Sequence, residues 1–399
     1  MKKTNTIIKK IVCLLLICLI IPLSSHQAEA TNLARVIKVE DTVIIKTIIK
    51  QIIGDLEDVR NYLETHEEIE IDINQRYLHK ELTEDVKRLE EAYPWLIKTE
   101  AIGESEDGRD IHLIKLGKGE HKSLMLGGVH AREIAATPLI VNMINEYAKG
   151  YYNEVEVDGF NIKELLDEVT LYIVPMVNPD GMELAVNGLE AIRDDSLREM
   201  LGKITNDFSY WKANARGVDL NRNFSNEHWG VVLPGKIRSS LINNGPSSEF
   251  YGGERAASER ETQAIEELVN NNDFRVMFDI HSRGRISYWN KTTKDKKFND
   301  RSYEIAKEIQ RVSGYVPVSK EQSFHGIGTD GNTTDFTVEQ GIHSLTIETM
   351  LFDIPHPYPT DLIQNEWDKV KHFGLVLAQE TVKLAEEDMV KEDMAKEVE

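Results

Sequence analysis

From about Tyr77 to about residue 385, the chain alternates short apolar runs with longer stretches of helical periodicity. Five of the apolar runs have the length of strands: residues 111–117, 123–129, 169–178, 274–281 and 343–349. Apolar strands that alternate with helices are typical of a parallel sheet that is buried on both faces. We therefore expect an α/β fold, a single large domain with a central mixed, mostly parallel twisted sheet flanked by helices.

The stretches between the strands predict the helices that cover this sheet. They lie at residues 80–93, 133–150, 259–271, 301–314 and 365–387, and Pro94 ends the first of them. Residues 103–110 are expected to form a glycine-containing loop ahead of the first strand. Residues 386–399 contain few apolar side chains, so we expect a charged tail that frays.

The first 30 residues have the pattern of a signal peptide. A basic start precedes an apolar run at residues 11–23, and the small residues Ala28 and Ala30 mark a cleavage site. The apolar run is short for a bilayer span, which favours export and removal over a retained membrane anchor. Both cysteines, Cys13 and Cys18, lie in this segment. The expected mature protein therefore has no disulfide, no thiol nucleophile and no membrane contact.

Residues 31–75 are predicted to form a helical N-terminal segment. Apolar side chains recur at positions 45, 49, 52, 56, 59 and 63, and Asp41 can cap the helix. The segment can dock on the main domain, expected at residues 76–385, or act as a prosegment. A coiled-coil dimer seam is the alternative, so the oligomeric state stays open.

The formal net charge of the chain is −21. A protein that binds the phosphate backbone needs a basic surface, so nucleic acid is excluded as an expected partner.

The stretch GGVHARE ends an apolar strand with two glycines and then presents His130 and Glu133. Their three-residue spacing in a first helical turn lets both side chains face one point. Imidazole nitrogen and carboxylate oxygen are ligands that zinc accepts, and a catalytic zinc site uses three protein ligands. The pair alone is also compatible with an ordinary strand–helix junction, so the chain must supply a third ligand.

Two more polar residues end apolar strands. His281 follows the strand at 274–280, and Glu348 lies near the end of the strand at 343–349. Sites in open α/β sheets gather at the carboxyl ends of the strands, which predicts that both residues lie near His130. His281 is then the expected third ligand, and Glu348 the expected base that takes a proton from water.

Three other histidines compete for the ligand position: His121, His325 and His343. His121 precedes its predicted strand and His343 begins one, which places both at the opposite ends of the strands from His130.

The loop at residues 211–224, WKANARGVDLNRNF, concentrates polar groups: Lys212, Arg216, Asp219, Asn221 and Arg222. Guanidinium and amide groups can hold a carboxylate at two points. Such a loop beside a zinc site predicts an enzyme that recognises a free carboxylate next to the bond that it cleaves. A charged surface loop is the alternative interpretation.

With these features together, the sequence resembles the zinc carboxypeptidase family over roughly residues 77–385. The matching motifs occur in the order HARE, PMVNPDG, GVDLNRNF, DIHS and TIE. The resemblance implies the zinc carboxypeptidase fold and one Zn²⁺ per chain. It also implies a ligand set and a base, which are His130, Glu133 and His281 for zinc and Glu348 as the base.

The resemblance implies roles in the loop as well. Asn221 and Arg222 would hold the terminal carboxylate of the substrate, and Asp219 would orient His130 from behind. Lys212 stands where the family has the arginine that stabilises the oxyanion, and Arg216 is a second candidate for that role.

Other positions bear on the substrate. The family position that sets side-chain preference falls at about Thr334, which is neither acidic nor large and apolar. The family's substrate-capping tyrosine has no match in residues 323–331, which contain Phe324 and His325. Arg132 either faces the substrate pocket or is solvated.

These departures resemble a bacterial branch of the family that cleaves the γ-D-glutamyl–diaminopimelate bond of cell-wall peptides. We therefore expect a secreted zinc metallocarboxypeptidase in which Glu348 activates a zinc-bound water, with a muropeptide as substrate. The alternative is a general carboxypeptidase that acts on ordinary peptides. A zinc-dependent amino-acid deacylase and an inactive binding protein are more remote alternatives, since both would leave part of these motifs unused.

Overall fold

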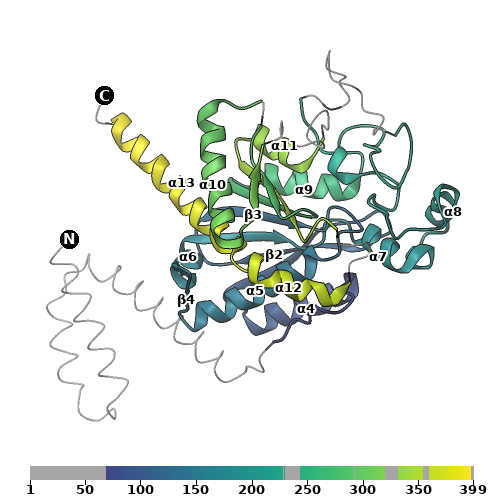
Figure 1. The fold of residues 1–399 in the computed structure, drawn as a ribbon, viewed down its shortest axis with the longest axis horizontal. Coiled ribbons are helices and arrows are strands. Elements are labelled where there is room, and N and C mark those ends of the chain that lie inside the picture. Colours follow the sequence, from purple (N-terminus) through teal and green to yellow (C-terminus); the bar gives the residue numbers. More distant parts are fainter. Residues whose placement is uncertain are drawn as a thin grey trace, which may run out of the picture. The chain divides into compact units, whose positions relative to one another are not determined.

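The computed structural model describes residues 69–227, 229, 243–291, 293–319, 331–353 and 359–396. These residues belong to one compact unit, His66–Glu399 (Figure 1). The expected signal peptide, the helix at 41–66, and Phe324 and His325 lie outside the described residues.

The packed chain begins before residue 76, where we expected the main domain to start. Ile69, Ile71 and Ile73 are buried, and the Ile69 carbonyl accepts a hydrogen bond of 2.8 Å from Asn145 Nδ2. The residues from 69 onward are therefore part of the unit that carries the sheet.

The centre of this unit is a sheet of eight strands in the order β1-β2-β6-β3-β7-β10-β8-β9. The strands are β1 (Ile97–Glu104), β2 (Asp110–Leu116), β3 (His121–Gly127), β6 (Val169–Val174), β7 (Phe274–Ser282), β8 (Ile286–Tyr288), β9 (Val316–Val318) and β10 (His343–Thr349). Strands β6, β3, β7 and β10 are parallel neighbours, and antiparallel pairs join β2 to β6 and β10 to β8. A separate hairpin pairs β4 (Glu156–Val157) with β5 (Phe160–Asn161). The expected mixed, mostly parallel sheet is confirmed.

Helices cover both faces of the sheet. They are α4 (His79–Ala92), α5 (Ala136–Tyr152), α6 (Ile162–Glu168), α7 (Pro179–Asn187), α8 (Asp195–Ile204), α9 (Arg260–Asn270), α10 (Lys296–Ser313), α11 (Thr333–Glu339), α12 (Ile363–Val370) and α13 (Phe373–Lys396). Helices α9 and α11 lie on one face of the sheet, and α5 and α12 lie on the other (Figure 1). None of the described helices is both long and apolar enough to span a membrane.

Strand β3 shows why these residues form a central strand. Leu124 and Leu126 point to one face and Met125 to the other, because successive side chains of a strand alternate. All three are almost completely buried, with exposed fractions of 0, 0 and 1%. Both faces of β3 are therefore covered, as the continuous apolar run predicted.

Two local features differ from the predictions. Strand β1, an antiparallel partner of β2, was not predicted; it ends at Glu104, and residues 105–109 form the loop expected at 103–110. The last helix is broken after α12, because the Tyr147 hydroxyl donates to the Lys371 carbonyl and accepts a hydrogen bond from the N–H of Gly374. Helix α13 then continues to Lys396, through most of the segment that we expected to fray.

Candidate metal centre

The carboxyl ends of β3, β7 and β10 meet at one edge of the sheet. In the register of the parallel pairs, Gly127 lies beside Ile280 and His281 lies beside Glu348. Neighbouring residues of adjacent parallel strands point to the same face, so His281 and Glu348 project together. The Thr349 hydroxyl also donates a 2.8 Å hydrogen bond to the His281 carbonyl, which ties the two strand ends together.

His130 and Glu133 follow β3 in a tight turn. The Glu133 N–H donates to the His130 carbonyl at 3.1 Å, and α5 begins only at Ala136. The prediction that both residues lie in the first turn of the helix was therefore wrong. Gly128 enters this turn with φ +64°, and a Cβ there would lie 2.7 Å from Met182. The backbone conformation favours glycine at that position, whereas the Met182 contact is with the flexible end of a side chain that can shift.

The side chains of His130, Glu133 and His281 converge in the buried interior of this edge. The two oxygens of Glu133 each lie 2.9 Å from a histidine nitrogen, Oε1 from His130 Nδ1 and Oε2 from His281 Nδ1. The two Nδ1 atoms lie 3.0 Å apart. Two imidazole nitrogens that face each other can share only one proton, whereas a cation can accept both lone pairs. Two nitrogens and a carboxylate are the donor set that a catalytic zinc uses, so the group fits the metal.

Charge in this group favours an ionised Glu133. Burial alone would raise the pKa of its carboxyl, but the two imidazoles, through hydrogen bonds and through their positive charge when protonated, outweigh burial and hold the pKa well below its usual value. The carboxylate also accepts a 3.1 Å hydrogen bond from the N–H of Ser282. Glu133 therefore stays negative, which a metal ligand requires.

A second carboxylate stands behind each histidine. Asp219 Oδ1 lies 3.3 Å from His130 Nε2, and Asp279 Oδ2 lies 3.0 Å from His281 Nε2. Such partners fix the orientation of a metal-binding imidazole and leave its other nitrogen to the metal. The position of Asp219 is the expected one. We did not predict a role for Asp279, although an acid in a buried apolar strand two residues before His281 was a usable signal.

Glu348 lies beside this group without belonging to it. Burial and the negative charge of Glu133 raise the pKa of the Glu348 carboxyl to about 7, despite the opposing charges of His281 and Lys212. A carboxyl whose pKa lies near neutral pH is suited to both accepting and donating a proton.

This pKa predicts a pH effect on the metal-free protein. Folding raises the pKa of this carboxyl from 4.5 to about 7, so between these pH values the folded state still holds a proton that the unfolded chain has lost. The folded state therefore loses stability as pH rises from about 4.5 to about 7, and the loss levels off above that range. Urea unfolding of metal-free wild type and Glu348→Gln at several pH values measures it. The wild type should lose stability relative to the variant in this window, and parallel curves would contradict the assignment.

The structure separates the two candidates for the oxyanion role. Lys212 is buried, and its Nζ lies 3.8 Å from Asp219 Oδ2, next to the histidine group. Arg216 instead turns to Glu259, with its Nη1 3.7 Å from Glu259 Oε1, and its side chain is 40% exposed. The structure therefore does not bring Arg216 to the group formed by His130, Glu133 and His281, the metal group.

Glu259 belongs to a second cluster of acids, with Glu106 and Glu261, whose carboxylates also lie close together. Asn214 Nδ2 donates to Glu259 Oε2 at 2.8 Å, and Arg216 approaches the same carboxylate. This cluster contains no imidazole, in contrast to the group at the strand ends.

Phe250 is a site residue that the sequence did not reveal. Its ring lies 5.3 Å from Lys212 Nζ and 5.9 Å from the guanidinium carbon of Arg222. Its N–H donates a 3.1 Å hydrogen bond to Asp219 Oδ2. The ring therefore lies against two of the three cations of the loop, Lys212 and Arg222. No motif in the sequence pointed to it, because it lies beyond the 211–224 loop.

Among the remaining predicted residues, Asn221, Arg222 and Thr334 lie around the start of α11. Arg132 contacts Tyr210 and Glu249. Asn221 Oδ1 accepts a 3.0 Å hydrogen bond from the N–H of Thr333, which places the Asn221–Arg222 pair next to Thr334. Arg132 Nη1 donates to the Tyr210 carbonyl at 3.1 Å and lies 3.4 Å from Glu249.

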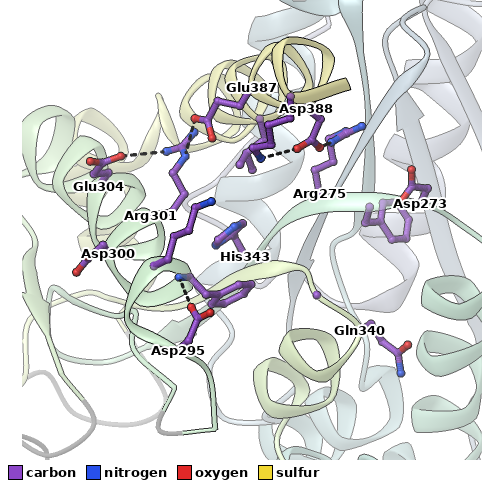
Figure 2. A pocket seen from close by; sticks show the side chains of 16 residues that line it. Asp273, Arg275, Asp295, Asp300, Arg301, Glu304, Gln340, His343, Glu387 and Asp388 are labelled. Carbon is purple, nitrogen blue, oxygen red and sulfur yellow. Dashed lines mark hydrogen bonds and ion pairs between the residues drawn. The ribbon is translucent and has the colours of Figure 1, made fainter. Parts of the chain in front are cut away.

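Two of the competing histidines, His121 and His343, lie at the other ends of their strands. His121 is the first residue of β3. His343 begins β10 and lines a cavity of about 680 Å³ between α10, α13 and the starts of β7 and β10 (Figure 2). Charged groups of this cavity pair with one another: Arg301 Nε lies 3.1 Å from Glu387 Oε1, and Arg275 is paired with Asp388. The cavity is separate from the metal group.

Both the sequence and the fold are similar to those of known proteins. A model of the zinc carboxypeptidase family matches residues 82–372. The chain is 31% identical over 286 residues to the γ-D-glutamyl-L-diamino acid endopeptidase 1 of Lysinibacillus sphaericus, which covers 70% of this chain and 69% of that protein. It is 26% identical over 335 residues to human carboxypeptidase B, with 78% and 74% coverage.

Among solved structures, bovine thrombin-activatable fibrinolysis inhibitor superposes with a TM-score of 0.62 at 20% identity. The superposition covers 78% of this chain and 99% of that one, and at this identity it supports the fold alone. The family is zinc-dependent, and the His130–Glu133–His281 group could hold the metal. The chain therefore belongs to the zinc carboxypeptidase family.

Proposed function

We propose that the protein is exported and cleaves cell-wall peptides at the γ-D-glutamyl–diamino acid bond, next to a free carboxylate. The observation that carries the chemistry is the convergence of His130, Glu133, His281, Glu348 and Lys212 at one sheet edge. The substrate class is supported by the similarity to the L. sphaericus γ-D-glutamyl-L-diamino acid endopeptidase. Export is supported by the signal-peptide pattern of the first 30 residues.

Zinc held by His130, Glu133 and His281 would polarise the amide carbonyl and lower the pKa of water at the site. The Glu348 carboxylate takes a proton from the attacking water as the water oxygen bonds to the carbonyl carbon. The same carboxyl then gives that proton to the amide nitrogen as the carbon–nitrogen bond breaks. The products are a carboxylate and a free amine.

The loop residues bind and orient the substrate. Arg222, with the Asn221 amide, holds the free carboxylate of the substrate through charge-assisted hydrogen bonds. Lys212 places positive charge where the carbonyl oxygen gains negative charge, and its burial strengthens this interaction. Asp219 and Asp279 keep the two imidazoles oriented.

Lys212 and Arg216 make a matched pair for a test of this assignment. Lys212→Met should lower kcat by about 10²–10³-fold, the loss typical of one oxyanion donor. Arg216→Met should leave kcat within about threefold, because Arg216 turns away from the metal group toward Glu259. Steady-state kinetics on one peptide substrate measures both. Equal losses in the two variants, or a larger loss in Arg216→Met, would contradict the role of Lys212.

The substrate is tested by incubating the purified protein, without its first 30 residues, with muropeptides and with ordinary peptides. Mass spectrometry should show release of the diamino acid from γ-D-glutamyl peptides. Removal of C-terminal residues from ordinary peptides alone would favour a general carboxypeptidase, the second candidate, which the similarity to carboxypeptidase B supports.

A further inference from the structure

Lys291 is a buried lysine that contacts the start of α11. It follows β8 by three residues, and only 8% of its surface is exposed. Its Nζ donates hydrogen bonds of 2.6 Å to Thr334 Oγ1 and 2.8 Å to Asp335 Oδ1. Removing an ammonium and a carboxylate from water costs several kcal/mol per ion, and their attraction offsets this cost only with good geometry. A buried pair of this kind is thus weak evidence for a stabilising role.

The contacts of Thr334 connect this pair to the reaction site. Thr334 Oγ1 lies 3.3 Å from Thr346 Oγ1 on β10. Thr346 precedes Glu348 by two residues, so both side chains project from the same face of the strand. Lys291 Nζ, Thr334 and Thr346 therefore form a continuous polar path that ends beside Glu348.

The same short segment also contacts the residues that bind the terminal carboxylate. The N–H of Thr333 donates to Asn221 Oδ1, and Thr334 and Asp335 follow directly in α11. Asn221, which we propose to hold the terminal carboxylate of the substrate, is therefore linked through Thr333 to the two residues that contact Lys291.

From this arrangement we infer that Lys291 and Asp335 determine specificity by reading the end of the substrate side chain, and that they select an end that carries a carboxylate next to an ammonium. This inference rests on the proposed function and sharpens it. The substrate class is a diamino acid whose side chain ends in a second amino-acid group, as in diaminopimelate. Lys291 binds the distal carboxylate and Asp335 binds the distal ammonium.

The charges explain why other ends are disfavoured. The ammonium of a lysine substrate meets the charge of Lys291, and the carboxylate of a 2-aminoadipate substrate meets that of Asp335. A norleucine side chain offers no polar group to exchange for the contacts of the pair. Only an end with both charges matches both residues, so discrimination comes from repulsion of the wrong ends as well as attraction of the right one.

The test uses four C-terminal residues on two backbones. Diaminopimelate, lysine, 2-aminoadipate and norleucine are each placed after a γ-D-glutamyl residue and, separately, in an ordinary L-peptide. For the wild type, kcat/KM should be about 10- to 100-fold higher for diaminopimelate than for lysine, the value of one hydrogen bond to a charged group. In Lys291→Gln/Asp335→Asn, which keeps polar groups in both positions, this ratio should fall to about one, with the norleucine rate little changed.

A nearby lysine provides the matched control. Lys294 lies against the Phe298 ring at 5.4 Å, and Lys294→Gln should keep the wild-type ratio. Thermal midpoints of all variants report folding, and if the double variant unfolds, Lys291→Arg, which keeps the charge, should retain preference for the distal carboxylate. If a variant turns over too slowly, calorimetry of the four free amino acids with zinc-loaded Glu348→Gln protein gives the same order.

The two peptide backbones separate the test of the proposed function from the test of Lys291 and Asp335. Cleavage of ordinary peptides alone would reject the proposed substrate, while the comparison of the four C-terminal residues would still test the role of Lys291. An equal rate for all four residues in the wild type, or a ratio that survives in the folded double variant, would overturn the role of Lys291 and Asp335.

Discussion

Replacing Glu348 by glutamine should lower kcat by roughly 10²–10⁴-fold, the usual contribution of a positioned acid–base group, with zinc still bound. Glutamine keeps the size of the side chain but cannot take a proton from water or give one to the leaving amine. Glu348 stands outside the His130–Glu133–His281 group, so the three candidate ligands stay in place. Steady-state kinetics gives the loss in kcat, and metal analysis of the same sample gives the zinc content.

A matched control is Glu339→Gln, which changes an exposed glutamate in α11. This variant should keep both zinc and activity. Full activity in Glu348→Gln, or loss of zinc together with activity, would contradict a role for Glu348 as acid and base.

Replacing His281 by alanine should abolish peptide hydrolysis by removing zinc. The variant loses one of the two imidazole ligands and leaves Asp279 and Glu133 without the histidine that separates them. The zinc content found by metal analysis should fall from one zinc per chain to a trace. Chelation of the wild type should likewise abolish activity, and added zinc should restore it.

Stability provides an independent measure of the same loss. A ligand that binds only the folded state stabilises it by about 2.7 kcal/mol at a free concentration of 100 times its Kd. Zinc should therefore raise the thermal midpoint of the wild type and leave that of His281→Ala unchanged. His121→Ala, which changes a histidine at the opposite end of β3, should behave like the wild type. An equal zinc-induced shift in His281→Ala would exclude His281 as a ligand.

Much of the metal group could be predicted from local sequence patterns. His281 and Glu348 both terminate apolar runs, and parallel strands bring such ends to one edge regardless of the details of packing. The spacing of His130 and Glu133 indicated a shared direction, although the structure achieves it in a turn before α5 rather than in the helix.

The parts that could not be predicted depend on contacts between distant segments. Lys212 and Arg216 lie four residues apart, and only the fold shows that Arg216 turns to Glu259. Phe250 reaches the loop through its ring and its N–H, neither of which leaves a pattern in the sequence. The break before α13 depends on Tyr147 from another helix.

The central claim is that one zinc ion, held by His130, Glu133 and His281, serves peptide hydrolysis in this chain. Anomalous diffraction at the zinc edge from crystals of the active protein tests it most directly. We expect one strong anomalous peak per chain, within bonding distance of Nδ1 of both histidines and of the Glu133 carboxylate. No peak in active crystals, or a peak only at the carboxylates of Glu106, Glu259 and Glu261, would contradict the claim.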